Sequence, residues 1–208
     1  MVEKEQVLQL LRDNQSFLIF GLEEYFSFGF SWDDREKQYI GYKKKQYKTA
    51  EDILDSVSIE FYLKDSEILK EAVDEKIEDE IITNYIRKDY RERCRYLLSG
   101  KKRNGFANLI QQNKKALNMK RAEKMESCYH LRPQLPEEWE KKKMADKKGY
   151  LMTGFCGITT YMGEMSLLLE FMARYGTFDM GILYCPEAKA GIMQFDNETS
   201  GGRWYWLE

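Results

Sequence analysis

The first 42 residues carry a helical pattern followed by a strand pattern. Within residues 3–13 the apolar positions recur at helical spacing, and Asn14 can end such a helix. Phenylalanine and tyrosine then alternate with polar residues over about 16–22, 25–32 and 37–42, which is typical of a β-meander. This part of the chain therefore predicts an N-terminal helix and an antiparallel sheet.

The middle of the chain has the pattern of several helices. Thr49 is a candidate N-cap, and Asp65 or Ser66 can cap a further helix over "EILKEAVDEKIEDEI". Over residues 82–98 the apolar positions recur every three or four residues, which predicts one helix. A second helix would place five residues on its inner side: Phe106, Leu109, Ile110, Asn113 and Leu117. Together these patterns predict a helical hairpin over 81–124.

The C-terminal third predicts strands around one helix. Prolines and charges gather in residues 131–149, which favours a linker with a short helix from Pro136. Beyond it we expect strands at 150–163, 178–185, 190–196 and 201–208, and a helix at 164–176. The predicted class is α+β, in three regions: 1–130 with the hairpin, the linker 131–149, and a small αβ unit with antiparallel strands over 150–208.

The net charge of −2 conceals an uneven distribution. Residues 1–80 carry 20 acidic and 11 basic side chains, whereas residues 81–124 carry 3 acidic and 13 basic side chains, a net charge of +10. Such asymmetry indicates a polyanionic ligand, an acidic protein partner, or an internal match between the segments. The sequence alone does not distinguish these three possibilities.

The basic hairpin is the strongest candidate binding surface. Arg87, Arg91 and Arg95 are spaced four apart and would share one helical face. Interleaved tyrosines and a phenylalanine would suit a surface that meets phosphates. The candidate binding residues of the hairpin are Arg87, Lys88, Arg91, Arg95, Lys101, Lys102, Arg103, Lys114 and Lys115. The alternative is an ordinary solvated helix surface that the acidic first 80 residues neutralise.

The last residues, "GGRWYWLE", add Arg203 as a tenth candidate. On a strand, Trp204 and Trp206 share one side, and Arg203 and Tyr205 share the other. An exposed face with an aromatic residue and an arginine would suit a partner or a stacked base. The alternative is that the tryptophans close the core and Arg203 simply lies outside.

Signatures of catalysis are sparse. His130 is the only histidine, so any nucleophile–histidine pair would have to use it. The spacing of Cys94, Cys128, Cys156 and Cys185 fits no zinc site. Cys156 could be a nucleophile near a helix start, but a small buried hydrophobe on a strand is the favoured interpretation. We expect no metal site and no cofactor, and we keep a small cysteine- or carboxylate-dependent enzyme as an alternative.

Nothing in the sequence indicates a membrane. No apolar run approaches the ~20 residues that span a bilayer, and the opening "MVEKEQVLQLL" lacks the apolar core of a signal peptide. The cysteines have the pattern of reduced thiols. We expect a cytoplasmic protein, and the sequence does not indicate its oligomeric state.

Two stretches, "GYKKKQYKTAEDILDS" and "LKEAVDEKIED", carry a resemblance to a group of known sequences. They resemble a hairpin–helix segment of small, uncharacterised accessory proteins of phages and mobile elements of Gram-positive bacteria. Lys44 stands where that segment has glycine, and Ala72 where it has isoleucine. The resemblance covers about 40 residues and assigns no functional residue. It implies a genetic setting in which inhibitors of host defence, anti-CRISPR proteins among them, are common.

The charge split and the sparse catalytic signatures together favour a binding protein. We expect a non-enzymatic inhibitor that occupies a charged surface of a nucleic-acid machine, and thus a protein or protein–nucleic-acid partner. Either the basic hairpin (81–124) or the acidic N-terminal part would make the contact. A direct DNA- or RNA-binding protein using the same hairpin is the first alternative.

Overall fold

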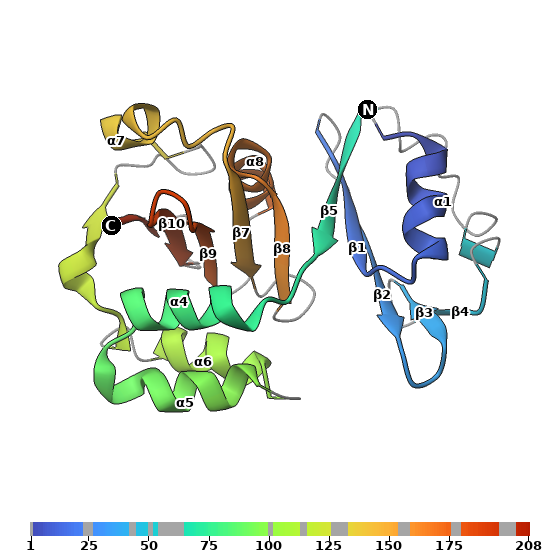
Figure 1. Cartoon of the computed structure of the whole chain (residues 1–208), viewed down its shortest axis with the longest axis horizontal. Coiled ribbons are helices and arrows are strands. Elements are labelled where there is room, and N and C mark those ends of the chain that lie inside the picture. Colours follow the sequence, from blue (N-terminus) through green and yellow to red (C-terminus); the bar gives the residue numbers. More distant parts are fainter. Residues whose placement is uncertain are drawn as a thin grey trace. The chain divides into compact units, whose positions relative to one another are not determined.

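The computed structural model describes eleven stretches of the chain: residues 2–22, 27–41, 45–49, 52–53, 65–99, 102–112, 116–125, 133–153, 159–175, 180–195 and 203–208. Its contacts divide the chain into two compact units, Met1–Glu71 and Ala72–Glu208. Each unit has helices and an antiparallel sheet, which confirms the α+β class (Figure 1). Among the described residues, no helix is long and apolar enough to cross a membrane.

The first unit is a helix with a sheet, as the sequence predicts. Helix α1 (Lys4–Arg12) ends where Asn14 takes the left-handed conformation, with φ of 53°. The strands lie in the order β4-β3-β2-β1-β5, and each is antiparallel to its neighbours. They are β1 (Phe17–Gly21), β2 (Ser27–Asp33), β3 (Gln38–Ile40), β4 (Gln46–Tyr47) and β5 (Ser66–Glu71). Thr49 Oγ1 accepts a hydrogen bond from Asp52 N at 3.1 Å, as expected of an N-cap.

Tyr39 ties the sheet of the first unit to the end of α1. Its side chain is buried, and its hydroxyl lies 3.1–3.3 Å from the carbonyls of Leu10, Leu11 and Gln15, any one of which can accept its single proton. The carbonyls of Leu10 and Leu11 also accept backbone N–H groups, from Gln15 at 2.9 Å and from Asn14 at 3.1 Å, so Tyr39 adds to the hydrogen bonds that close the end of α1. Burial raises the pKa of Tyr39 to about 12.

Replacing Tyr39 with phenylalanine is expected to lower the free energy of unfolding of the first unit by about 1 kcal/mol. Because its pKa is raised in the folded state, the neutral hydroxyl contributes stability that is complete below about pH 10 and is lost as the pH rises through 12. Hydrogen exchange of α1 and β1 at neutral and alkaline pH measures both effects. Tyr47→Phe is the matched control, since the Tyr47 hydroxyl makes no hydrogen bond among the described residues; an equal loss in both variants would contradict the role of Tyr39.

The second unit is built on a six-stranded antiparallel sheet in the order β8-β7-β9-β10-β11-β6. Pro186 lies in the turn between residues 185 and 190. The region predicted as one strand at 150–163 forms two paired strands, because residues 148–153 pair with residues 159–164. The strands are β6 (Ala122–Lys124), β7 (Lys148–Thr153), β8 (Thr159–Glu164), β9 (Met180–Cys185), β10 (Ala190–Phe195) and β11 (Arg203–Leu207).

Helices cover both faces of this sheet. Met152, Ile182 and Tyr184 belong to one buried cluster with apolar residues of α4 (Glu75–Tyr85), α5 (Lys88–Leu98) and α6 (Asn104–Gln112). The opposite face of β7 meets α8 (Met165–Tyr175), since a Cβ on Gly149 would touch Met165. Figure 1 shows α4, α5 and α6 gathered together beside the strands of this unit.

One predicted helix is wrong in its first half. The sequence predicts a helix over residues 67–81, but Ser66–Glu71 form strand β5, paired residue by residue with β1. Helix α4 begins only at Glu75, capped by Asp74. Glutamate, leucine and lysine favour a helix intrinsically, and pairing with a buried neighbouring strand overrides that preference here.

The predicted continuous helix over 82–98 is also wrong, because it breaks at Ile86 and Arg87. Both residues have extended backbone, and Ile86 forms an isolated antiparallel bridge with Leu117. Arg87 N donates to Ala116 O at 2.8 Å. The break follows from this pairing, which divides one apolar stripe between α4 and α5.

Residues 133–149 pack within the second unit. The short helix α7 (Glu137–Lys141) follows Pro136, as the sequence predicts. Trp139 and Met144 are buried. The structure thus divides its two units after Glu71, whereas the sequence pattern placed a linker at 131–149.

Candidate functional site

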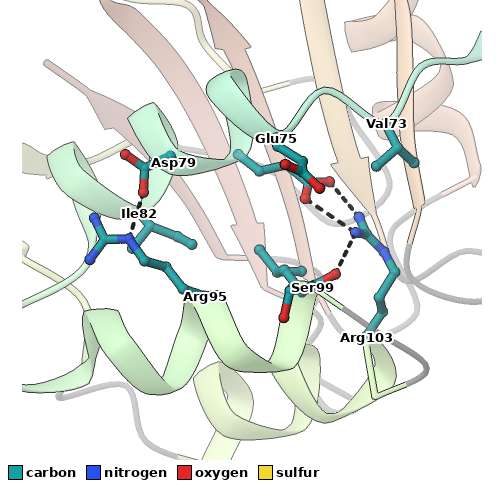
Figure 2. A pocket seen from close by; sticks show the side chains of 9 residues that line it. Val73, Glu75, Asp79, Ile82, Arg95, Ser99 and Arg103 are labelled. Atoms are coloured by element: carbon teal, nitrogen blue, oxygen red, sulfur yellow. Dashed lines mark hydrogen bonds and ion pairs between the residues drawn. The ribbon is translucent and has the colours of Figure 1, made fainter.

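Helices α4 and α5 border a pocket in the second unit (Figure 2). Asp74 fixes the start of α4, since its Oδ1 accepts from Lys76 N at 2.9 Å and from Ile77 N at 3.3 Å. The pocket has a volume of about 530 Å³. Its lining residues are Val73, Glu75, Glu78, Asp79, Ile82, Arg95, Leu98, Ser99 and Arg103. Apolar side chains and five charged side chains therefore line the same pocket.

Glu78 and Arg103 form an ion pair at one side of this pocket. The Glu78 side chain is only 6% exposed and that of Arg103 is 20% exposed. Arg103 Nη1 and Nη2 donate to the two carboxylate oxygens, and Nη1 also donates to Leu98 O at 2.9 Å. Thr160 Oγ1 adds a hydrogen bond to Glu78 at 2.9 Å. The buried carboxylate is thus held by a bidentate guanidinium and a hydroxyl.

Arg95, on the other side of the pocket, also donates hydrogen bonds to acceptors of its own unit. Its Nε donates to Asp79 Oδ1 at 2.6 Å, its Nη1 to Glu92 Oε1 at 2.8 Å and its Nη2 to Thr83 Oγ1 at 3.1 Å. The hydrogen bond to Asp79, followed by that to Glu92, raises the pKa of the Arg95 guanidinium. Figure 2 shows the Arg95–Asp79 pair and the Arg103 side chain at opposite ends of the pocket.

The other two predicted arginines are bound within the protein as well. Arg87 lies outside the helical face that the sequence predicts, because it is the N-cap of α5, and it pairs with Asp89 at 3.0 Å. Arg91 Nε donates to Ile86 O at 2.9 Å, across the break between α4 and α5. All four predicted hairpin arginines therefore contact acceptors of their own unit.

Exposed cations remain on the outer side of the hairpin. Lys88, Arg93 and Lys102 are exposed and take part in no ion pair among the described residues. Tyr96, on the same helix as Lys88 and Arg93, is 61% exposed, a high value for a large aromatic side chain. We call Lys88, Arg93, Tyr96 and Lys102 the hairpin face. Sequence reasoning missed Arg93, although its spacing of three from Tyr96 places the two side by side on a helix.

Tyr96 and Lys102 contact each other at the tip of the hairpin. The ammonium of Lys102 lies 5.0 Å from the ring centroid of Tyr96 and donates to its hydroxyl at 2.9 Å. This hydrogen bond and the positive charge lower the pKa of Tyr96. The pair joins α5 to the turn before α6, so an exposed aromatic ring is held in place beside a cation.

The remaining predicted site residues divide into two groups. Arg203 is exposed at the start of β11, while Trp204 and Trp206 are buried, so the alternation along this strand is as predicted and the tryptophans belong to the core. Several candidates lie outside the described residues: Lys101, Lys114, Lys115, Cys128, His130 and Cys156.

The described residues bear on metal binding and on two of the four cysteines. Among them, no group of three or more His, Cys, Asp or Glu side chains is placed to hold a metal ion. Cys94 and Cys185 are buried free thiols. Burial raises the pKa of Cys94 to about 11, which keeps it protonated and unreactive at neutral pH.

The chain matches no protein-family model, no curated protein and no solved structure. The resemblance to accessory proteins of mobile elements therefore stays a prediction.

Proposed function

We propose that this chain is a non-enzymatic binding protein that contacts a protein partner through the hairpin face. The observation that carries the proposal is the exposed Tyr96 ring, fixed by Lys102 and flanked by Arg93. Tyrosine and arginine are the residues that most often anchor protein–protein contacts, and a fixed side chain loses little entropy on binding. The positive charge of the face favours a partner with an acidic surface.

The hydrogen bonds of the arginines favour a protein partner over a nucleic acid. A phosphate-binding surface needs several cations whose donors are available to phosphate oxygens. Here the guanidiniums of Arg87, Arg95 and Arg103 already pair with carboxylates, and Arg91 is bound to a backbone carbonyl. Two acidic partners come from α4, Asp79 for Arg95 and Glu78 for Arg103, so part of the charge asymmetry is matched inside the unit.

A more specific proposal concerns the effect of this binding on the partner. Inhibition of a nucleic-acid machine by occupying its charged surface, in the manner of anti-CRISPR proteins, is supported by the resemblance of the two quoted segments. The contact chemistry of the hairpin face is the same whether or not the partner is such a machine.

The test is a charge reversal confined to the hairpin face. We expect the triple variant Lys88→Glu, Arg93→Glu and Lys102→Glu to lose a protein that the parent chain captures from a lysate of a Gram-positive bacterium. Because these side chains are exposed, the melting temperature should change by no more than about 4 °C.

The matched control reverses three exposed lysines of the second unit that lie outside residues 81–124: Lys76, Lys143 and Lys148. It makes the same change in net charge, and it should retain the partner. Equal capture by both triple variants would contradict the proposal, and so would capture of nucleic acid without protein.

A further inference from the structure

The pocket between α4 and α5 has features that the hairpin face does not use. Its apolar side is formed by Val73, Ile82 and Leu98, and Val73 is 49% exposed. A volume of about 530 Å³ lies in the range of pockets that enclose small molecules or single side chains. Apolar walls beside charged groups suit a ligand that has an aliphatic stem and a charged end.

The hydrogen bonds of the lining arginines indicate which ligand charge the pocket favours. The Nε, Nη1 and Nη2 atoms of Arg95 donate to Asp79, Glu92 and Thr83. Arg103 donates to both oxygens of Glu78 and to Leu98 O. An anion would have to displace carboxylates that already hold these guanidiniums, so the pocket disfavours an anionic ligand.

The carboxylates favour a cation instead. Three acids and two arginines line the pocket, which gives it a net charge of −1. Glu75 is exposed in the first turn of α4 and takes part in no ion pair or side-chain hydrogen bond among the described residues. Asp79 accepts from Arg95 through Oδ1, and a carboxylate can accept several hydrogen bonds. Glu75 and Asp79 thus add carboxylate acceptors to a pocket that also has an apolar side (Figure 2).

We propose that this pocket binds an alkylammonium group, presented as a lysine side chain of a partner protein. The stem would lie along Val73, Ile82 and Leu98, and the ammonium would meet Glu75 and Asp79. The inference rests on the proposed function only for the carrier of the lysine. The pocket itself can be tested without any partner, so its failure is distinct from failure of the hairpin face.

The test uses three probes with similar side chains and different end groups. N-acetyl-lysine methylamide has a cationic end, the norleucine analogue has no charge, and the 2-aminoadipate analogue has an anionic end. Methyl NMR of the full chain reports on Val73, Ile82 and Leu98. We expect saturable shifts of these methyl groups with the lysine probe, about fivefold weaker binding of the norleucine probe, and no shifts with the aminoadipate probe.

Two variants test which carboxylate the ammonium group contacts. Glu75→Gln should weaken the lysine probe about fivefold and leave the norleucine probe unchanged. Glu140→Gln, an exposed residue of α7, is the matched control and should change neither. The inference is overturned if the lysine probe causes no saturable shift, if an uncharged or anionic probe binds as tightly, or if both variants behave alike.

Discussion

Replacing Arg103 with alanine is expected to lower the free energy of unfolding of the second unit by about 3 kcal/mol or more. The change leaves the carboxylate of Glu78, which is 6% exposed, with only the Thr160 hydroxyl as a described side-chain partner. An uncompensated buried charge is far more costly than the loss of an exposed ion pair. It also frees Leu98 O, which Arg103 satisfies at present.

Urea unfolding and hydrogen exchange of α4 and β8 measure this loss. Lys102→Ala is the matched control, because it removes a neighbouring cation that is exposed and should change stability by less than about 1 kcal/mol. The double variant Glu78→Met, Arg103→Met should recover part of the loss, since it removes both charges together. Equal effects of Arg103→Ala and Lys102→Ala would show that the Glu78 pair is not a buried one.

Replacing Gly191 with alanine is expected to cost a similar amount, about 3 kcal/mol or more. Gly191 lies in β10 opposite Tyr184 of β9. A Cβ built on it would stand 2.1 Å from Leu183 O and 3.2 Å from Tyr184 Cα, both backbone atoms. A rotamer change cannot relieve such contacts, so the two central strands would have to move apart.

Gly105→Ala supplies the comparison for this prediction. There the added Cβ would stand 2.9 Å from Leu97 Cδ2, the end of a flexible side chain, and alanine favours a helix more than glycine does. Its free energy of unfolding should stay within about 1 kcal/mol of the parent. Thermal unfolding of both variants decides the matter: similar melting temperatures for Gly191→Ala and the parent would contradict the close approach of β9 and β10.

Local patterns predicted the elements that short-range signals define. The apolar stripe of α1 and its end at Asn14 are both present, and so are the short helix after Pro136 and the alternation around Trp204. In each case the signal and the structure lie within a few residues of each other. Strand β5 was mistaken for a helix because its partner β1 lies about 50 residues earlier in the chain.

The candidate site was predicted only in part, because its arginines have partners distant in sequence. The cationic spacing on α5 is visible in the sequence, but Arg103 and Glu78 lie 25 residues apart, and Arg95 and Asp79 lie 16 apart. The acidic run before the hairpin has the pattern of a solvated face. Folding brings it against Arg95 and Arg103, so the sequence pattern overstates the basic surface of the described residues.

The most direct test of a protein-binding hairpin is a salt titration of nucleic-acid binding. Fluorescence anisotropy with single- and double-stranded oligonucleotides should show no saturable binding at ~150 mM salt, because four of the hairpin arginines already bind acceptors within the protein: Arg87, Arg91, Arg95 and Arg103. Binding at that salt concentration would contradict this account if the Lys88→Glu, Arg93→Glu, Lys102→Glu variant abolished it. The hairpin would then be a nucleic-acid interface.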